Sequence, residues 1–184
     1  NEPGWQNHWQ HEGFTPDYSQ IRIKLETLLK TGHPDDVLTL GKELIELGNR
    51  QIEESHDEGE TATEIESCMP VIVKALEQSS MAEADKLAWA VDVVLKDDYD
   101  VFNAFDEYLG HRNAKTDWDI LSDRLLKQLG NMERADGKKD FHRNYARDRL
   151  SDWVVYALEQ AGRDDEIIPL CEAEARKTLS YTRL

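Results

Sequence analysis

The sequence LLKTGHPDDVLTL at residues 28–40 returns as LEQAGRDDEIIPL at residues 158–170. The positions that are identical in the two copies are Leu28/Leu158, Gly32/Gly162, Asp35/Asp165 and Leu40/Leu170. Each copy predicts a helix that ends at the glycine, an acidic residue that caps the next helix, and a buried apolar stripe after it. A helical hairpin that recurs within one chain indicates stacked antiparallel helices, an architecture that more often holds partners than performs chemistry.

The rest of the chain supports an all-α fold. Apolar residues recur at helical spacing from about Tyr18 onward, and no run of any length alternates with period two. We therefore expect about eight helices, arranged as antiparallel hairpins. Pro70 should kink one helix near Glu66 or divide it into two shorter ones. Residues 1–17 show no period and predict an irregular lead-in, so residues 18–184 are expected to form one helical repeat domain.

The apolar pattern also predicts which side chains form the core. In the second helix the expected buried stripe is Val37, Leu40, Leu44 and Leu47, and in the first it is Ile21, Leu25, Leu28 and Leu29. Gly41 and Gly48 lie seven residues apart and predict a close approach of another helix. Trp118 and Trp153 should anchor the core, and Ser80 should cap the helix that follows it.

Length and composition favour a protein that needs neither disulfides nor a structural metal. The chain has 184 residues, 39% of them hydrophobic, which is enough for one continuous core. Its two cysteines, Cys68 and Cys171, fall in helical patterns and predict reduced thiols in a cytoplasmic protein. No apolar run approaches the roughly 20 residues that span a bilayer. The absence of an initiator Met and the end at SYTRL predict that this is a piece of a longer polypeptide.

The charge of the chain disfavours nucleic acid as a partner. The formal net charge is -16, from 22 Lys and Arg against 38 Asp and Glu. Contact with phosphate backbones depends on Lys and Arg that release condensed counterions, so a protein partner is expected instead.

The repeated turn resembles the helix-turn-helix junction of tetratricopeptide repeats, although the small alanine of that junction is Val37 in one copy and Ile167 in the other. Three longer segments together resemble the helical region downstream of the zinc finger in bacterial SWIM zinc finger proteins. They are RDRLSDWVVYALEQAGRDDEIIPLCEAEARKTLSYTRL (147–184), ELGNRQIEESHDEGETATEI (46–65) and ADKLAWAVDVVLKDDYD (84–100). The resemblance implies a tetratricopeptide-like α-α superhelix. The CxC and CxH pairs of the finger have no counterpart here, so zinc binding is not implied.

No residue pattern predicts a catalytic, metal or cofactor site. His8 and His11 would need further ligands to hold a metal, and their neighbours supply only Glu2 and Glu12. Cys171 and His142 would make a nucleophile and a base only if the fold brought them together. The glycine-rich, serine-nucleophile and metalloprotease motifs are absent. We therefore expect no cofactor and no enzymatic activity, with an unrecognised helical active site as the remaining alternative.

One basic and aromatic cluster is a candidate surface for partner binding. The segment RNYARDR supplies Arg143, Tyr145, Arg147 and Arg149, which could contact an anionic peptide or a phosphate. The competing interpretation is ion pairing on the helix surface with Asp140, Asp148 and Asp152. Trp89 lies off the apolar stripe of its helix and could be a second contact or a second core face.

These observations predict a non-catalytic protein-protein interaction scaffold within a larger bacterial protein. The alternative is an accessory domain of a nucleic-acid-associated SWIM zinc finger protein, which rests on the resemblance alone. If SYTRL begins another helix of the array, the eighth helix, which carries Ile167, Leu170 and Cys171, presents an apolar face that a following repeat would cover. Weak self-association through that face is then expected.

Overall fold

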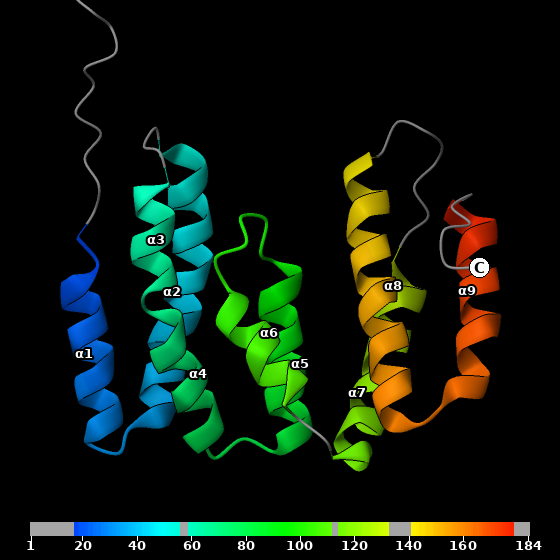
Figure 1. The fold of residues 1–184 in the computed structure, drawn as a ribbon, viewed down its shortest axis with the longest axis horizontal. Coiled ribbons are helices and arrows are strands. Elements are labelled where there is room, and N and C mark those ends of the chain that lie inside the picture. Colours follow the sequence, from blue (N-terminus) through cyan, green and yellow to red (C-terminus); the bar gives the residue numbers. More distant parts are fainter. Residues whose placement is uncertain (1–16, 56–58, 112–113, 133–140, 179–184) are drawn as a thin grey trace, which may run out of the picture. The chain divides into compact units, whose positions relative to one another are not determined.

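The computed structural model describes residues 17–55, 59–111, 114–132 and 141–178, and within them it is entirely helical, without a strand (Figure 1). The helices are α1 (Ser19–Lys30), α2 (Pro34–Glu54), α3 (Glu60–Glu66), α4 (Met69–Gln78), α5 (Glu83–Leu95), α6 (Asn103–Gly110), α7 (Lys115–Asn131), α8 (Phe141–Ala161) and α9 (Asp164–Thr178). The all-α prediction is confirmed. Residues 1–16 of the predicted lead-in lie outside the described residues.

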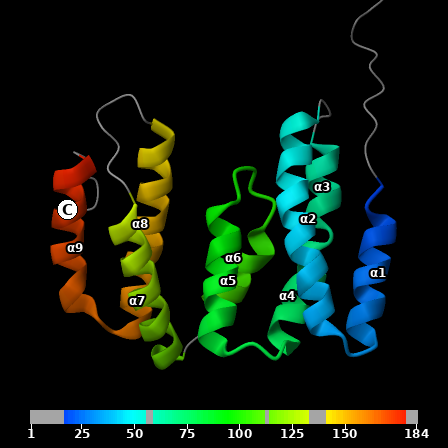
Figure 2. The same cartoon turned by 180° about the vertical axis from the view of Figure 1, so that it is seen from behind.

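The described helices form two compact units. The first unit contains α1 to α4 together with Asp98–Val101, and the second contains α5 to α9. In the first unit α1 packs against α2 and α4, while α2 packs against α3 and α4. In the second unit α7 and α8 form the most extensive helix pair, with α5 against α7 and α9 against α8. Figures 1 and 2 show α2 beside α3 and α4, and α7 beside α8.

The two repeated turns have the same backbone hydrogen bonds. The Gly32 N–H donates to Leu29 O at 3.1 Å, and the Gly162 N–H donates to Glu159 O at 3.0 Å. One residue later, His33 N–H donates to Leu28 O and Arg163 N–H donates to Leu158 O, at 3.0 and 2.9 Å. With φ of 83° and 72° at the two glycines, both turns are Schellman motifs. The predicted helix ends are therefore confirmed.

The acidic residues after these glycines are not the expected N-caps. His33 precedes α2 without a side-chain cap bond, and the first turn of α2 contains Asp35 and Asp36. Asp165 likewise lies in the first turn of α9. Carboxylates in a first turn are stabilised by the positive end of the helix dipole. Another expected cap is also wrong, since Ala82 rather than Ser80 precedes α5.

Gly41 and Gly48 mark the close helix contact that their spacing predicts. Both are buried on α2, and a Cβ atom added at Gly41 would lie 2.9 Å from Ile72 Cγ2 of α4. A Cβ at Gly48 would lie 3.2 Å from Ile65 Cδ1 of α3. The missing side chains thus let α3 and α4 pack directly on the backbone of α2.

Pro70 marks the division between two short helices, α3 and α4, which was one of the two outcomes expected from the sequence. It is the second residue of α4, where no backbone donor is needed, and α3 ends at Glu66. The division places Ile65, Met69 and Ile72, all fully buried, on the side that faces the core of the first unit.

Trp118 forms the centre of the second unit. It is fully buried, and its ring meets Tyr156 edge to face with the centroids 5.4 Å apart. Trp153 meets the same tyrosine at 5.5 Å but is only partly buried, so it is a peripheral anchor rather than the core residue that was expected. The outward side of α9 is mainly polar among its described side chains, with Ile168 as its exposed large hydrophobic residue. Ile167 and Leu170, which were expected on the apolar stripe of this helix, are partly buried, and self-association through it stays a prediction.

The positive φ of the turn glycines predicts a measurable cost of substitution. We expect Gly32→Ala and Gly162→Ala each to lower the free energy of unfolding by about 1 kcal/mol, because a Cβ atom disfavours this backbone conformation. Gly130→Ala is the control, since no heavy atom lies within 4 Å of the added Cβ and no positive φ is present there. It should be neutral or stabilising by up to about 1 kcal/mol. Equal effects of all three substitutions in urea denaturation would contradict the strain argument.

Candidate functional site

An apolar groove runs between α1 and α2 in the first unit. Its volume is about 420 Å³. The lining residues are Asp17, Tyr18, Ile21, Lys24, Leu25, Leu40, Glu43, Leu44, Leu47 and Gln51. Leu25 and Leu44 form a buried floor, whereas Ile21, Leu40 and Leu47 remain 41%, 39% and 53% exposed. Leucine and isoleucine side chains left in water at helical spacing are typical of a surface that a partner covers.

A tyrosine links the two walls of the groove. Tyr18 precedes α1, is 5% exposed, and its hydroxyl donates a hydrogen bond to Gln51 Oε1 of α2. Burial raises the pKa of the Tyr18 phenol, so the group stays protonated and remains a donor at neutral pH. The bond ties the first described residues of the hairpin to the last part of α2, at one end of the groove.

The rim of the groove carries charges of both signs. Asp17 accepts a hydrogen bond from the Ser19 N–H at 2.9 Å, and these contacts with Ser19 hold the Asp17 pKa below its ordinary value. Glu43 contributes a second carboxylate and Lys24 the single lysine among the lining residues. The rim therefore has two acidic groups against one basic group, which favours a ligand with basic flanks.

The sequence pattern predicted that the apolar residues of this groove belong to the core. Leu40 and Leu47 have the same helical spacing as Val37 and Leu44, so all four were expected to be buried. Val37 and Leu44 are buried as expected, whereas Leu40 and Leu47 are exposed. The neighbouring row that contains Leu38 and Ile45 is buried as well, because α3 and α4 pack on the glycine side of α2. The presence of two apolar rows on one helix was the available signal, since one helix partner covers only one of them.

Two of the predicted partner-binding arginines are engaged inside the second unit. The Arg147 side chain is 7% exposed and pairs with Glu174 of α9, which is 4% exposed. Its Nε and Nη2 donate to the two carboxylate oxygens at 2.6 and 2.9 Å, and its Nη1 donates to Met132 O at 3.1 Å. Arg149 is half-buried and donates to Val94 O of α5. Arg147 is thus a structural residue and not part of an open anion site, which corrects that assignment.

The other members of that predicted set, as far as they are described, lie in different surroundings. Tyr145 is exposed, and the Arg149 guanidinium lies 5.7 Å from the centre of its ring. The side chain of Arg143 lies outside the described residues. Trp89 is partly buried on α5, where it meets Phe105 of α6 edge to face at 5.4 Å. The second-core-face alternative for Trp89 is the one that its packing supports.

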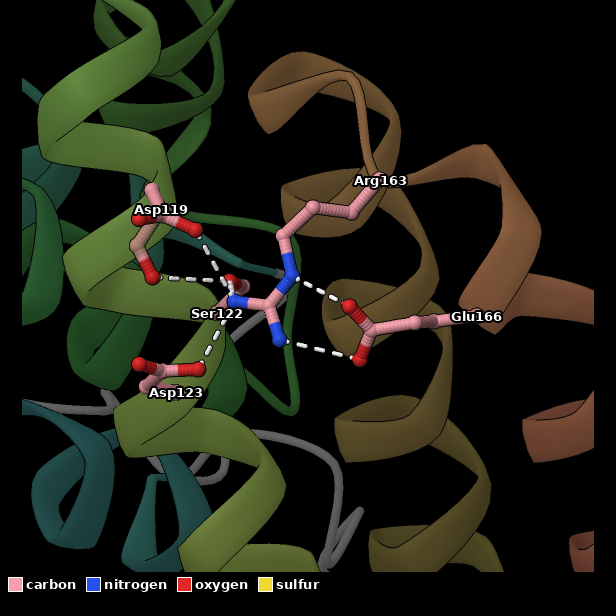
Figure 3. A network of polar contacts seen from close by, with 5 residues as sticks. All are labelled: Asp119, Ser122, Asp123, Arg163 and Glu166. Atoms are coloured by element: carbon pink, nitrogen blue, oxygen red, sulfur yellow. Dashed lines mark hydrogen bonds and ion pairs between the residues drawn. The ribbon is translucent and has the colours of Figure 1, made fainter.

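Arg163 is the centre of a polar network in the second unit (Figure 3). Its Nη1 donates to Asp119 Oδ1 at 2.9 Å, to Ser122 Oγ at 2.8 Å and to Asp123 Oδ1 at 2.7 Å, all on α7. The Nε and Nη2 atoms form a bidentate pair with Glu166 of α9 at 2.7 and 2.9 Å. One guanidinium in the turn after α8 therefore joins α7 to α9.

The ionisation of this network follows its contacts. The hydrogen bonds that Arg163 donates to Glu166 and Asp123 raise the pKa of its guanidinium, which keeps it charged throughout the accessible pH range. Hydrogen bonding to Arg163 lowers the pKa of Glu166 from its ordinary value of 4.5. Nε, Nη1 and Nη2 of Arg163 all donate to side chains of α7 or α9. The network is therefore a clamp that links these two helices, and not an open anion site.

Removing the clamp should weaken the second unit in a pH-dependent way. We expect Arg163→Ala to lower the free energy of unfolding by about 1 kcal/mol at pH 7, since the partly exposed charges are screened by solvent. Because the folded-state pKa of Glu166 is lowered, its contribution is present above 4.5 and is lost as pH falls through the folded value. Urea denaturation of both proteins at pH 7 and near pH 3 should show the difference shrinking at the acidic pH. A pH-independent difference would contradict this assignment.

The other candidate chemistry finds no support in the described residues. No group of three or more His, Cys, Asp or Glu side chains that could hold a metal occurs among them. Cys68 and Cys171 are both buried and free, and burial raises the pKa of the Cys68 thiol, which disfavours the reactive thiolate. The side chain of His142, as well as His8 and His11, lies outside the part of the chain that is described. Of the helices that are described, none has the length and apolar character to cross a membrane.

Comparison with known proteins returned no relative. No family model matches the chain, and no curated protein and no solved structure matched it.

Proposed function

We propose that the chain is a non-catalytic scaffold that binds an amphipathic helix of a partner protein in the groove between α1 and α2. The observation that carries the proposal is the exposure of Ile21, Leu40 and Leu47 around a buried leucine floor. A helix that presents apolar residues at positions i, i+3, i+4 and i+7 fits such a groove. The excess of carboxylates on the rim, together with the net charge of -16, favours a partner helix with Lys and Arg beside its apolar stripe.

We also infer that the helices belong to a tetratricopeptide-like superhelix in a cytoplasmic protein. Support comes from the two Schellman turns, whose glycines and hydrogen bonds correspond residue by residue. The accessory nucleic-acid role remains the alternative proposal from the SWIM resemblance. It is less favoured, because Arg147 and Arg149 donate hydrogen bonds within the second unit instead of facing a free surface.

Selection from a displayed library of amphipathic helices tests the proposed function. The library would hold helices of about 18 residues, five turns long, with a fixed apolar stripe and varied flanking charges. We expect selected peptides to carry basic flanks and to bind with micromolar Kd that weakens as salt is added. Leu47→Glu should weaken binding at least about tenfold, a change of 1.4 kcal/mol.

Ile23→Glu is the matched control for this measurement. Ile23 lies on α1 and is 52% exposed, close to the 53% of Leu47, but it does not line the groove. The control should leave Kd unchanged within about twofold, since surface substitutions outside an interface have small effects. Equal loss of binding in both variants, or selected peptides without basic flanks and helical spacing, would contradict the proposal.

A further inference from the structure

The groove between α1 and α2 begins where the described chain begins. Asp17 and Tyr18 line one end of it, and residues 1–16 are covalently attached there. Those residues contain no Leu, Ile, Val or Met, so their large apolar side chains are Trp5, Trp9 and Phe14 alone. An exposed aliphatic groove and a short aromatic segment are therefore joined by a single peptide bond.

The segment is long enough to reach the whole groove. Trp9 precedes Asp17 by eight residues, and an extended chain spans about 3.3–3.6 Å per residue, or roughly 27 Å in total. The α1 side of the groove extends from Asp17 to Leu25, which corresponds to about 12 Å at 1.5 Å per residue. A tether of this length gives a local concentration in the millimolar range, well above that of a free partner.

Electrostatic repulsion from the acidic rim is weaker for this segment than for a second copy of the chain. Glu2 and Glu12 are its only charged side chains, apart from any charge on its two histidines. A second copy would bring another net charge of -16 to a rim that already carries Asp17 and Glu43. Trp and Phe rings also bury a large apolar area with little loss of side-chain entropy.

We propose that the groove between α1 and α2 is occupied by aromatic side chains of the chain's own first 16 residues, with Trp5 and Trp9 as the anchors. A partner helix then reaches the groove only by displacing this segment. The inference concerns the free protein and does not depend on the identity of any partner.

Fluorine NMR of the full chain labelled with 5-fluorotryptophan tests the proposal. The chain has five tryptophans, and the signals of Trp5 and Trp9 are assigned by their loss in Trp5→Phe and Trp9→Phe. We expect at least one of these signals to be shifted from that of free fluorotryptophan and to show a reduced solvent isotope shift between H₂O and D₂O. Leu47→Glu should return it to the solvent-exposed position, and Ile23→Glu should leave it unchanged.

Three outcomes would overturn the proposal. Both signals could be fully solvent-exposed in the parent protein, the shielded signal could be unaffected by Leu47→Glu and also by Leu40→Glu, or its shielding could rise with protein concentration. The last outcome would assign the groove to a second copy of the chain. Circular dichroism of each variant confirms that the helices remain formed. No partner peptide is present in these samples, so failure of helix binding in the selection experiment is a separate result.

Discussion

Glu174→Ala is expected to lower the free energy of unfolding by about 3–5 kcal/mol, among the largest effects of any single substitution in the second unit. The change leaves the Arg147 guanidinium buried between α8 and α9 without its bidentate carboxylate. An unpaired charge in such a site cannot recover the hydration that it loses on folding. Chemical denaturation followed by circular dichroism would measure the loss.

Two further variants separate burial of the charge from loss of the glutamate itself. Glu172→Ala removes the neighbouring exposed carboxylate of α9, which pairs with Arg176 at 3.0 Å, and should cost no more than about 0.5 kcal/mol. Replacing both members of the buried pair, as Arg147→Met with Glu174→Leu, should restore most of the stability, because no buried charge remains. A loss for Glu174→Ala as small as that for Glu172→Ala would show that water reaches the pair.

The features that sequence predicted best are local in the chain. The two turns required only a glycine at the end of each helix, and a positive φ together with two backbone hydrogen bonds follows from residues within six positions. The division at Pro70 and the close contact at Gly41 were predictable for the same reason, since each depends on one residue type within a helical pattern.

The features that sequence missed depend on which distant helix covers which face. Arg147 looked like a surface cation in RNYARDR, but its partner Glu174 is 27 positions away and only folding brings the two together. Leu40 and Leu47 looked like core residues, since periodicity does not say how many helices pack around α2. The groove exists because α4 covers the row of α2 that contains Gly41 and leaves Leu40 and Leu47 exposed.

The acidic caps failed for a different reason. Asp35 and Asp165 stand close enough to their glycines to suggest a cap, but each helix begins two residues earlier than a cap at those positions would require. The side chains still lie at the positive end of the helix dipole. Their interaction with the dipole stabilises the helix by less than an N-cap hydrogen bond would. Composition alone does not distinguish these two neighbouring positions.

Gly41→Val is expected to lower the free energy of unfolding of the first unit by about 3 kcal/mol, at the upper end of the range for overpacked cores. Even the Cβ atom would lie 2.9 Å from Ile72 Cγ2 and 3.1 Å from Cγ1 and Cδ1. Ile72 is fully buried, and its Cγ2 is fixed directly to a branched Cβ, so it cannot rotate away. The better helix propensity of a non-glycine residue, worth less than about 1 kcal/mol, does not offset this clash.

Substitution of Ile72, the residue that the added side chain would meet, tests this explanation. Ile72→Ala alone should cost about 2–5 kcal/mol through the cavity that it leaves. In the double variant Gly41→Val with Ile72→Ala, the added valine occupies that cavity, so the combined loss should be smaller than the sum by at least about 1 kcal/mol. Gly48→Ala should cost less than Gly41→Val, because the added methyl would lie 3.2 Å from Ile65 Cδ1 and 3.3 Å from its Cγ2, and neither contact is shorter than 3.0 Å. Additive losses in the double variant would mean that α2 and α4 move apart instead of clashing, and the glycine would then serve helix geometry rather than close packing.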